Sequence, residues 1–325
     1  MSRSLGPNLA GTWYPAGRDE LRSEIRRMLD REPEPQAGAD PVVALIEPHA
    51  GYAWSGQVAA AGFRQIQGAS YRRVILIGPS HYEYFEGASI PSARQYDTPL
   101  GAVALDEEVL DDLAGKDGCT SGDDPFRREH CLEIELPFLQ ETLQPGWKLV
   151  PVLLGHDLAG GPAEQIARQL APWTGAETLV VASSDFTHYG DRFRFVPFRD
   201  RVQERLGDLD TGALDRITTG DREGFGSYVN RTGATICGRN AIDILMRLVP
   251  DGARIDLLRY DTSGNQNSDW SHSVSYAAVS FRDRAGGRPD AGGKADDDAI
   301  RPGERNWLLN LARESICTSL DHAPD

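Results

Sequence analysis

The chain has 325 residues, of which 40% are hydrophobic and 26% charged, a composition typical of a globular protein rather than a disordered one. Acidic residues outnumber basic ones by 49 to 34, which gives a formal net charge of −15. Such a surface repels phosphate groups, so we expect no nucleic acid partner. The apolar runs are far shorter than the roughly 20 residues that a bilayer requires, so we expect no membrane span.

The amino-terminal residues and the cysteines both favour a cytoplasmic location. The first residues lack the apolar stretch of about 7–15 residues that a secretory signal carries. The four cysteines have no CxxC spacing and are too few to form a disulfide framework for a chain of this length. We therefore expect a cytoplasmic protein with reduced thiols.

Helical and strand patterns alternate along the first half of the chain. Four short apolar runs have the character of strands buried on both faces, namely residues 42–46, 74–77, 149–154 and 179–182. Helical patterns precede or separate these runs, at residues 19–31, 57–66, 106–113, 132–143 and 163–170. This alternation predicts an α/β fold, a layered sandwich with a central, mostly parallel sheet.

The second half is richer in helical patterns and ends in a change of composition. Helices are predicted at residues 198–209, 212–217, 222–229 and 239–248, and strands at residues 254–260 and 273–281. Residues 284–300 are rich in Gly, Ala and Asp and are predicted to be a flexible linker. The sequence therefore predicts a main domain over residues 1–283, this linker, and a helix within residues 301–325.

Histidines and an acid follow the four buried strands. His49 and His81 come directly after the first two strands, His156 follows the third, and Asp185 and His188 follow the fourth. In open α/β sheets, ligands bind beyond the carboxyl ends of the strands, so we expect these side chains at one edge of the sheet. Taken singly, each histidine is explained as well by a hydrogen bond to the backbone. Their coincidence favours a transition-metal site.

Cys237 is the candidate for an anionic ligand of this site. It precedes a helix that is predicted to begin near Gly238, and a helix N-terminus lowers the pKa of a thiol and so favours the thiolate. The alternative is that Cys237 is a small buried apolar side chain. His130, at the start of the predicted helix 132–143, could face the same cleft, although Glu129 there is explained by the helix dipole.

Nine short segments together resemble the Memo family, whose prokaryotic members are also called AmmeMemoRadiSam system protein B. They occur in the order found in the family and cover residues 11 to about 281. The segments are GTWYPA (11–16), PHAGYAWSG (48–56), ILIGPSH (75–81), YDTPLG (96–101), EHCLEIELPFLQ (129–140), VPVLLG (150–155), SSDFTHYGDRF (183–193), TICGR (235–239) and SVSYAA (273–278).

This resemblance implies a fold similar to that of class III extradiol dioxygenases, which are non-haem iron enzymes. It implies a metal site at His49, His81 and Cys237, with Fe(II) as the expected metal and copper as the alternative. It also makes His188 the candidate acid/base residue, with Asp185 supporting it or binding the metal. Tyr82, which follows His81, departs from members that carry a second histidine there.

The segment WLLNLARESICTSL, at residues 307–320, resembles the first helix of an AMMECR1-type domain. Such domains are fused to Memo proteins or encoded beside them in prokaryotes. The resemblance implies that an AMMECR1-type protein and a radical SAM enzyme are partners. The alternative for this segment is a surface helix that packs on the main domain.

Three functions remain open from the sequence. The first is an iron-dependent, dioxygenase-like oxidoreductase of unknown substrate, although a thiolate in place of the usual carboxylate means that ring cleavage does not follow from the fold. The second is a non-enzymatic adaptor that presents the same cleft to a metal, a small molecule or a peptide. The third, a metal-free hydrolase that uses Cys237, ranks lowest because no oxyanion-hole motif accompanies the cysteine.

Overall fold

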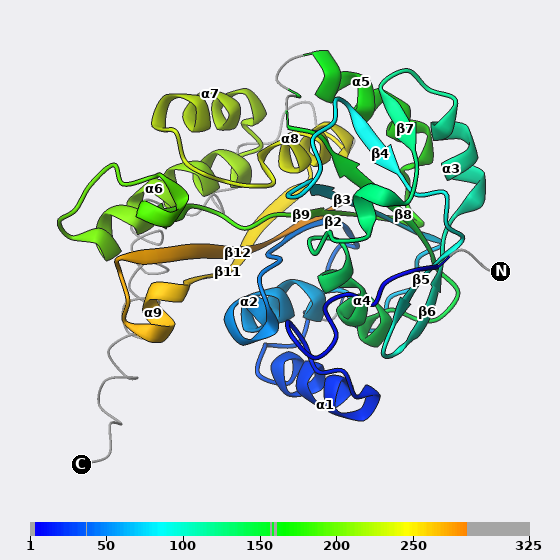
Figure 1. Cartoon of the computed structure of the whole chain (residues 1–325), viewed down its shortest axis with the longest axis horizontal. Coiled ribbons are helices and arrows are strands. Elements are labelled where there is room, and N and C mark those ends of the chain that lie inside the picture. The colour runs from blue at the N-terminus through cyan, green and yellow to red at the C-terminus, as the bar shows by residue number, and fades with distance from the viewer. Residues whose placement is uncertain (1–3, 37, 157, 159–160, 285–325) are drawn as a thin grey trace. The chain divides into compact units, whose positions relative to one another are not determined.

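The computed structural model describes residues 4–284 except for residues 37, 157 and 159–160 (Figure 1). The linker predicted for residues 284–300 lies outside the described residues from residue 285 onward, and the helix predicted within residues 301–325 lies wholly outside them. The domain boundary predicted there therefore stays a prediction.

A nine-stranded sheet crosses the described part of the chain. Its centre is four parallel strands in the order β2-β9-β3-β8, which run over Val42–Glu47, Thr178–Ser183, Arg73–Pro79 and Lys148–Leu154. Antiparallel strands extend one side of this centre, namely β12 (His272–Arg282), β11 (Arg254–Thr262) and β10 (His188–Gly190). On the other side β4 (Ala88–Ile90) pairs antiparallel with β8, and β7 (Cys119–Ser121) pairs parallel with β4. The sheet therefore presents four parallel carboxyl ends side by side.

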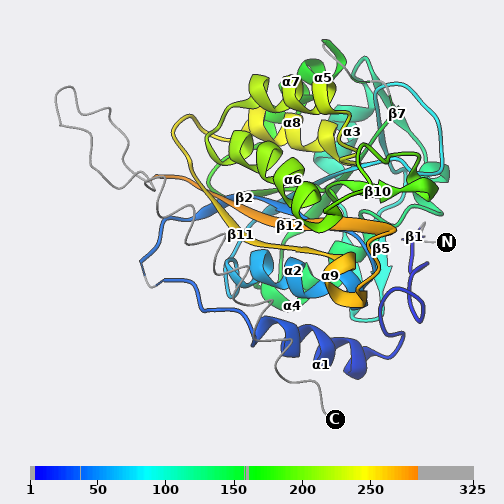
Figure 2. The ribbon, with the colours of Figure 1, turned by 90° about the vertical axis from the view of Figure 1, so that its left-hand side faces the viewer.

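Helices cover both faces of the sheet, as Figures 1 and 2 show. One face carries α1 (Arg18–Leu29), α2 (Tyr52–Arg64) and α4 (Leu136–Thr142). The other face carries α5 (Gly161–Leu170), α6 (Val202–Thr218), α7 (Arg222–Thr232) and α8 (Arg239–Leu248). Strand β9 is buried over its whole length, as expected for a strand between two helical layers. The predicted layered α/β sandwich with a mostly parallel central sheet is confirmed.

The remaining elements are short. Helix α3 (Glu107–Ala114) precedes β7, and α9 (Ser263–Asn267) joins β11 to β12. A separate three-stranded sheet contains β1 (Ser4–Leu5), β5 (Gln95–Thr98) and β6 (Gly101–Ala104). These strands have two or four residues each, too few for a periodic pattern, and the sequence did not predict them. Within the described residues, no helix is both long and apolar enough to cross a membrane.

Three predicted helices differ from the structure in two informative ways. Residues 198–209 and 212–217 were expected to form separate helices, but a single helix, α6, covers residues 202–218 and begins four residues later than predicted. Gly212 lies inside this helix, at a point where α6 packs closely on α7. A Cβ at this position would come within 2.2 Å of the Tyr228 hydroxyl on α7. The pattern at 132–143 divides into a 3₁₀ turn (Glu133–Glu135) and α4, with Pro137 in the first turn of α4. In both cases the helix-breaking residue type serves packing or helix initiation rather than termination.

Candidate metal centre

The carboxyl ends of β2, β9 and β3 bring His49 and His81 together. The two histidines follow β2 and β3, which flank β9, so the rings meet above the end of the central strand. Their centroids are 5.1 Å apart and the rings are perpendicular at 86°. The predicted convergence of these strand-end histidines is therefore present.

His49 is held rigidly inside the protein. The residue is 1% exposed, and its ring Nδ1 lies 2.8 Å from the Ser183 hydroxyl oxygen at the end of β9. That hydroxyl has a single proton, which it donates to the Cys131 carbonyl at 2.6 Å, so it accepts the Nδ1 proton of His49; Glu135 Oε1 lies 3.0 Å from the same oxygen. The Nε2 lone pair then faces the opposite way. Burial and the neighbouring imidazoles hold the pKa of His49 well below its ordinary value, and the ring is neutral at pH 7.

Cys237 lies where this lone pair points. Its Sγ is 3.1 Å from His49 Nε2, and the backbone N–H of Asp185 donates to the same sulfur at 3.2 Å. Gly238 follows as the N-cap residue of α8, and a Cβ there would come within 2.4 Å of the Ser184 Cβ. The glycine in the TICGR motif therefore lets the thiol approach the end of β9 closely.

The protonation of Cys237 differs from the sequence prediction. The position before a helix is as predicted, but burial raises the pKa of the thiol well above its ordinary value, and the Asp185 carboxylate raises it further. The N–H groups of Asp185 and Gly238 lower the pKa without offsetting burial. A helix N-terminus is a weaker effect than full burial of a charge, and the metal-free side chain is a thiol. A coordinated cation would deprotonate it.

His81 is oriented by a carboxylate instead of a hydroxyl. Its Nδ1 lies 2.8 Å from Glu129 Oε1, and its backbone N–H donates to Glu129 Oε2 at 2.7 Å. Burial alone would raise the pKa of Glu129, but the hydrogen bond from His81 and the charges of His81 and His130 outweigh it and lower the pKa to about 2. Glu129 therefore acts as the acceptor that directs His81 Nε2 away from it, rather than as a helix-dipole residue.

His130 is the third imidazole of this group. Its ring lies 4.3 Å from that of His81 and 5.3 Å from that of His49, centroid to centroid. Each of the three histidines has a ring nitrogen within 4.8 Å of the others, so these are the imidazoles that the structure brings closest together. His81 also shares such a group with Glu129 and Cys131. Burial lowers the pKa of His130 to about 4, and this ring too is neutral at pH 7.

Asp185 and His188 lie beside the histidine group in different roles. The buried Asp185 Oδ1 accepts the backbone N–H of His49 at 2.8 Å, so the carboxylate fixes the loop that carries this histidine. Burial raises the pKa of Asp185 to about 7, although the N–H groups of His49 and Ala50 oppose the rise. His188 Nδ1 faces two carbonyls, of Phe186 at 3.0 Å and of Thr235 at 3.1 Å. Since carbonyls only accept, Nδ1 carries the proton and Nε2 keeps a free lone pair.

The amino-terminal segment forms a wall of the site. Glu133, which is fully buried, accepts the backbone N–H groups of Asn8 and Leu9 and the Tyr14 hydroxyl at 2.7 Å. This anchor places Trp13 against His130, with ring centroids 4.6 Å apart. The motifs GTWYPA and EHCLEIELPFLQ are therefore in contact.

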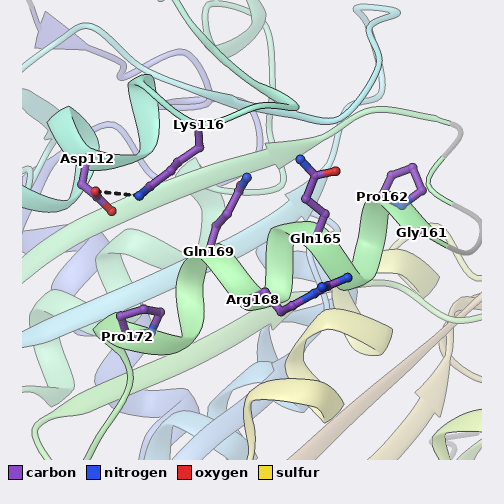
Figure 3. Close-up of a pocket in the computed structure, with 8 residues that line it drawn as sticks. All are labelled: Asp112, Lys116, Gly161, Pro162, Gln165, Arg168, Gln169 and Pro172. Carbon is purple, nitrogen blue, oxygen red and sulfur yellow. Dashed lines mark ion pairs between the residues drawn. The ribbon is translucent and has the colours of Figure 1, made fainter.

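His156 stands apart from the group. It follows β8, as predicted, but the side chain is exposed and stacks on Tyr84 with centroids 5.3 Å apart. A surface groove lies apart from the group as well. It has a volume of about 700 Å³, lies along α3 and α5, and contains Lys116, which pairs with Asp112 at 3.1 Å (Figure 3). None of the predicted site residues lines this groove.

The donor atoms of the site suit a transition metal. His49 and His81 each bond a protein oxygen through Nδ1 and leave Nε2 for another partner, which is the arrangement of metal-binding histidines in proteins. A thiol lies next to one of them. Imidazole and thiolate together favour iron, copper or zinc over magnesium or calcium. Ser183, Glu129 and Glu135 are the supporting residues that the sequence did not single out for this role.

The fold and the cluster define an α/β protein with a candidate metal site at the carboxyl edge of its parallel strands. Residues 6–280 match the model of the family described as Memo-like protein, so the chain belongs to the Memo-like family.

Curated relatives agree with this membership. The "Protein memo-1 homolog" of Caenorhabditis elegans is 33% identical over 83% of this chain and 80% of its own. The "MEMO1 family protein TV1383" of Thermoplasma volcanium is 32% identical over 84% of this chain and 96% of its own. A solved structure, "uncharacterized protein JW3007" from Escherichia coli, is 12% identical with a TM-score of 0.43 over 74% of this chain and 99% of its own.

Proposed function

We propose that this Memo-like protein binds a metal through His49, His81 and Cys237 and works as a non-haem iron-dependent oxidoreductase of unknown substrate. The observation that carries the proposal is the orientation of the two imidazoles. Each Nδ1 is bound to a protein oxygen, of Ser183 or Glu129, and each Nε2 is left for a metal. Three protein ligands are typical of catalytic sites, which keep positions open for substrate.

Iron is the first choice because the family resemblance relates the chain to non-haem iron dioxygenases. Copper is the alternative, since a thiolate and two imidazoles also suit this metal. Ferrous iron in this site would supply one-electron chemistry with dioxygen or a chelating substrate.

His188 is the residue suited to proton transfer. Its Nδ1 is bound to two carbonyls, so the ring can accept a proton only at Nε2. Burial holds the pKa of His188 below its ordinary value, which keeps this nitrogen free at neutral pH. Asp185 accepts the backbone N–H of His49, and its own backbone N–H donates to Cys237 Sγ, so it positions two of the proposed ligands.

The test is metal analysis of anaerobically purified protein, beside the variants His49→Ala and Cys237→Ala. We expect near-stoichiometric iron in the natural chain and little in either variant. The variant His156→Ala is the matched control, because this strand-end histidine lies outside the group, and it should keep its iron.

A second measurement separates an enzyme from a metal carrier. Iron-loaded protein is screened for oxygen consumption with catechols and other chelating compounds, with His188→Ala as the comparison. Uptake that requires both iron and His188 supports the oxidoreductase. A natural chain that takes up neither Fe(II) nor copper contradicts the proposal.

An adaptor function is the alternative, and it has an observation of its own. Tyr82 and Tyr84 follow β3 beside the site and are 45% and 76% exposed, and Arg128 lies over the Tyr82 ring. Exposed aromatic side chains beside a cleft are typical of binding surfaces. An AMMECR1-type protein and a radical SAM enzyme are the partners to test. An adaptor should bind its partner when His49, His81 and Cys237 are all replaced by alanine, and should lose it in Tyr82→Ala/Tyr84→Ala.

A further inference from the structure

His130 is a buried imidazole that has no role in the proposed metal site of His49, His81 and Cys237. The residue is 8% exposed, and it lies at the start of the segment that leads into α4, far in sequence from both strand ends. Its ring packs between those of Trp13 and His81, with centroids 4.6 and 4.3 Å away. An apolar ring would pack equally well in this position. A buried imidazole is costly unless its nitrogens have polar partners, so we expect one here.

Its ring Nδ1 has no such partner among the described residues. The atom is buried and makes no hydrogen bond, although Glu129 Oε1 is 3.2 Å away. That oxygen already accepts from His81 Nδ1 at 2.8 Å, from the backbone N–H of His130 at 2.9 Å and from that of Cys131 at 3.3 Å. Three N–H groups therefore already donate to this carboxylate oxygen, and His130 Nδ1 does not donate to it.

The same ring faces the two proposed histidine ligands. A ring nitrogen of His130 lies within 4.8 Å of ring nitrogens of His49 and His81, and its ring stands at 86° to that of His49. Three imidazole nitrogens at this spacing can reach a single ion with small side-chain rotations, because bonds from zinc-like ions to imidazole nitrogen are about 2.0–2.1 Å long.

We propose that His130 is a metal ligand, so that the site offers three imidazoles and the Cys237 sulfur rather than two imidazoles and the sulfur. This inference rests on the proposed metal binding by His49 and His81. It changes the chemistry expected of the site, since four protein donors leave fewer positions open for substrate than three.

The experiment uses Co(II) alone as the probe, added anaerobically to the metal-free full-length chain. Affinity is measured by competition with a chelator. The coordinated imidazoles are counted from the hyperfine-shifted N–H proton signals of the Co(II) protein. The variants are His130→Ala and His130→Phe, of which the second keeps an aromatic ring against Trp13. His156→Ala is the matched control, and melting curves of the metal-free proteins verify folding.

A ligand role predicts that both His130 variants lose more than about 100-fold in Co(II) affinity, beyond the 10–100-fold typical of losing a supporting partner. It also predicts one imidazole N–H signal fewer than in the natural chain. Unchanged affinity, or a weakened affinity with the same number of signals, would overturn the ligand role and leave the His49–His81 site standing. If the natural chain and His156→Ala bind neither Co(II) nor Fe(II), the proposed function fails and this inference fails with it.

Discussion

The two sides of the candidate metal centre are built differently. The inner side consists of His49, Ser183 and Cys237, and its histidine is 1% exposed. The outer side consists of His81 and Glu129 with His130, and the His81 side chain is 26% exposed. A neutral hydroxyl orients the histidine on the inner side, whereas an ionised carboxylate orients the one on the outer side.

This difference indicates a division of tasks. A neutral chain of hydrogen bonds below His49 fixes geometry without adding charge to a fully buried region, where an unpaired charge is costly. On the outer side Glu129 is also only 1% exposed, but it can stay ionised because His81 and two backbone N–H groups stabilise it. The inner side therefore fixes the positions of the candidate donors, and the outer side sets the charge beside them.

Loss of His49 should have the largest effect of any single change. The variant His49→Ala removes the donor that faces both His81 and Cys237, so we expect metal affinity to fall by more than about 100-fold. Elemental analysis after dialysis measures this loss. Iron at natural levels in the variant would show that the inner side does not bind metal.

Glu129→Gln should weaken the hydrogen bond that orients His81 and lower the free energy of unfolding of the metal-free protein. The folded pKa of Glu129 is about 2, below its unfolded value of 4.5, so its contribution to stability is present above pH 4.5 and is lost as the pH falls toward 2. At pH 7 the variant should therefore be less stable by about 2–3 kcal/mol, an order-of-magnitude figure from 1.36 kcal/mol per pKa unit. Urea unfolding with a chelator present measures it.

The pH dependence supplies the control for this variant. The difference between Glu129→Gln and the natural chain should shrink as the pH falls from 4.5 toward 2, because the unfolded natural chain then takes up a proton that the folded Glu129 still lacks. A difference that is the same at pH 7 and pH 3.5 would mean that the carboxylate charge is not the source of the effect.

Ser183→Ala should have a smaller effect on metal binding. The change removes the acceptor of the His49 Nδ1 proton, which fixes the tautomer, and we expect about a tenfold loss of metal affinity. Ser183→Thr keeps the hydroxyl and should recover most of the affinity. Equal losses in the two variants would point to crowding at β9 instead of a lost hydrogen bond.

Deletion of residues 285–325 should have almost no effect on stability. The composition of residues 284–300 predicts a linker, and a segment beyond a linker contributes little to the folding of the domain before it. Differential scanning calorimetry of the deleted chain tests this expectation. A clear fall in melting temperature would instead mean that the carboxyl-terminal residues pack on the main domain.

The sequence predicted the strand-end histidines because buried parallel strands have a strong local signature. Continuous apolar runs identified β2, β3, β8 and β9, and the residues that follow such strands meet at one edge. The order β2-β9-β3-β8, which places β9 between the two histidine loops, is a long-range property that no local pattern contains.

The supporting residues were harder to predict. Glu129 looked like a helix-dipole residue, because nothing in the local sequence shows that His81 hydrogen-bonds to it. Ser183 is one serine among many until the sheet places it under His49. The protonation of Cys237 was also misjudged, since a sequence shows the helix that follows a cysteine but not the depth at which the cysteine is buried.

The pairing of His49 with Cys237 joins residues 188 positions apart in the chain. During synthesis the sulfur is therefore the last of the proposed ligands to leave the ribosome, long after both loops that carry His49 and His81. A nascent chain cannot offer the complete set of donors until all four central parallel strands, β2, β3, β8 and β9, have been made. Metal binding should thus follow synthesis of this parallel centre, so that a metal would stabilise strands already made rather than direct their pairing.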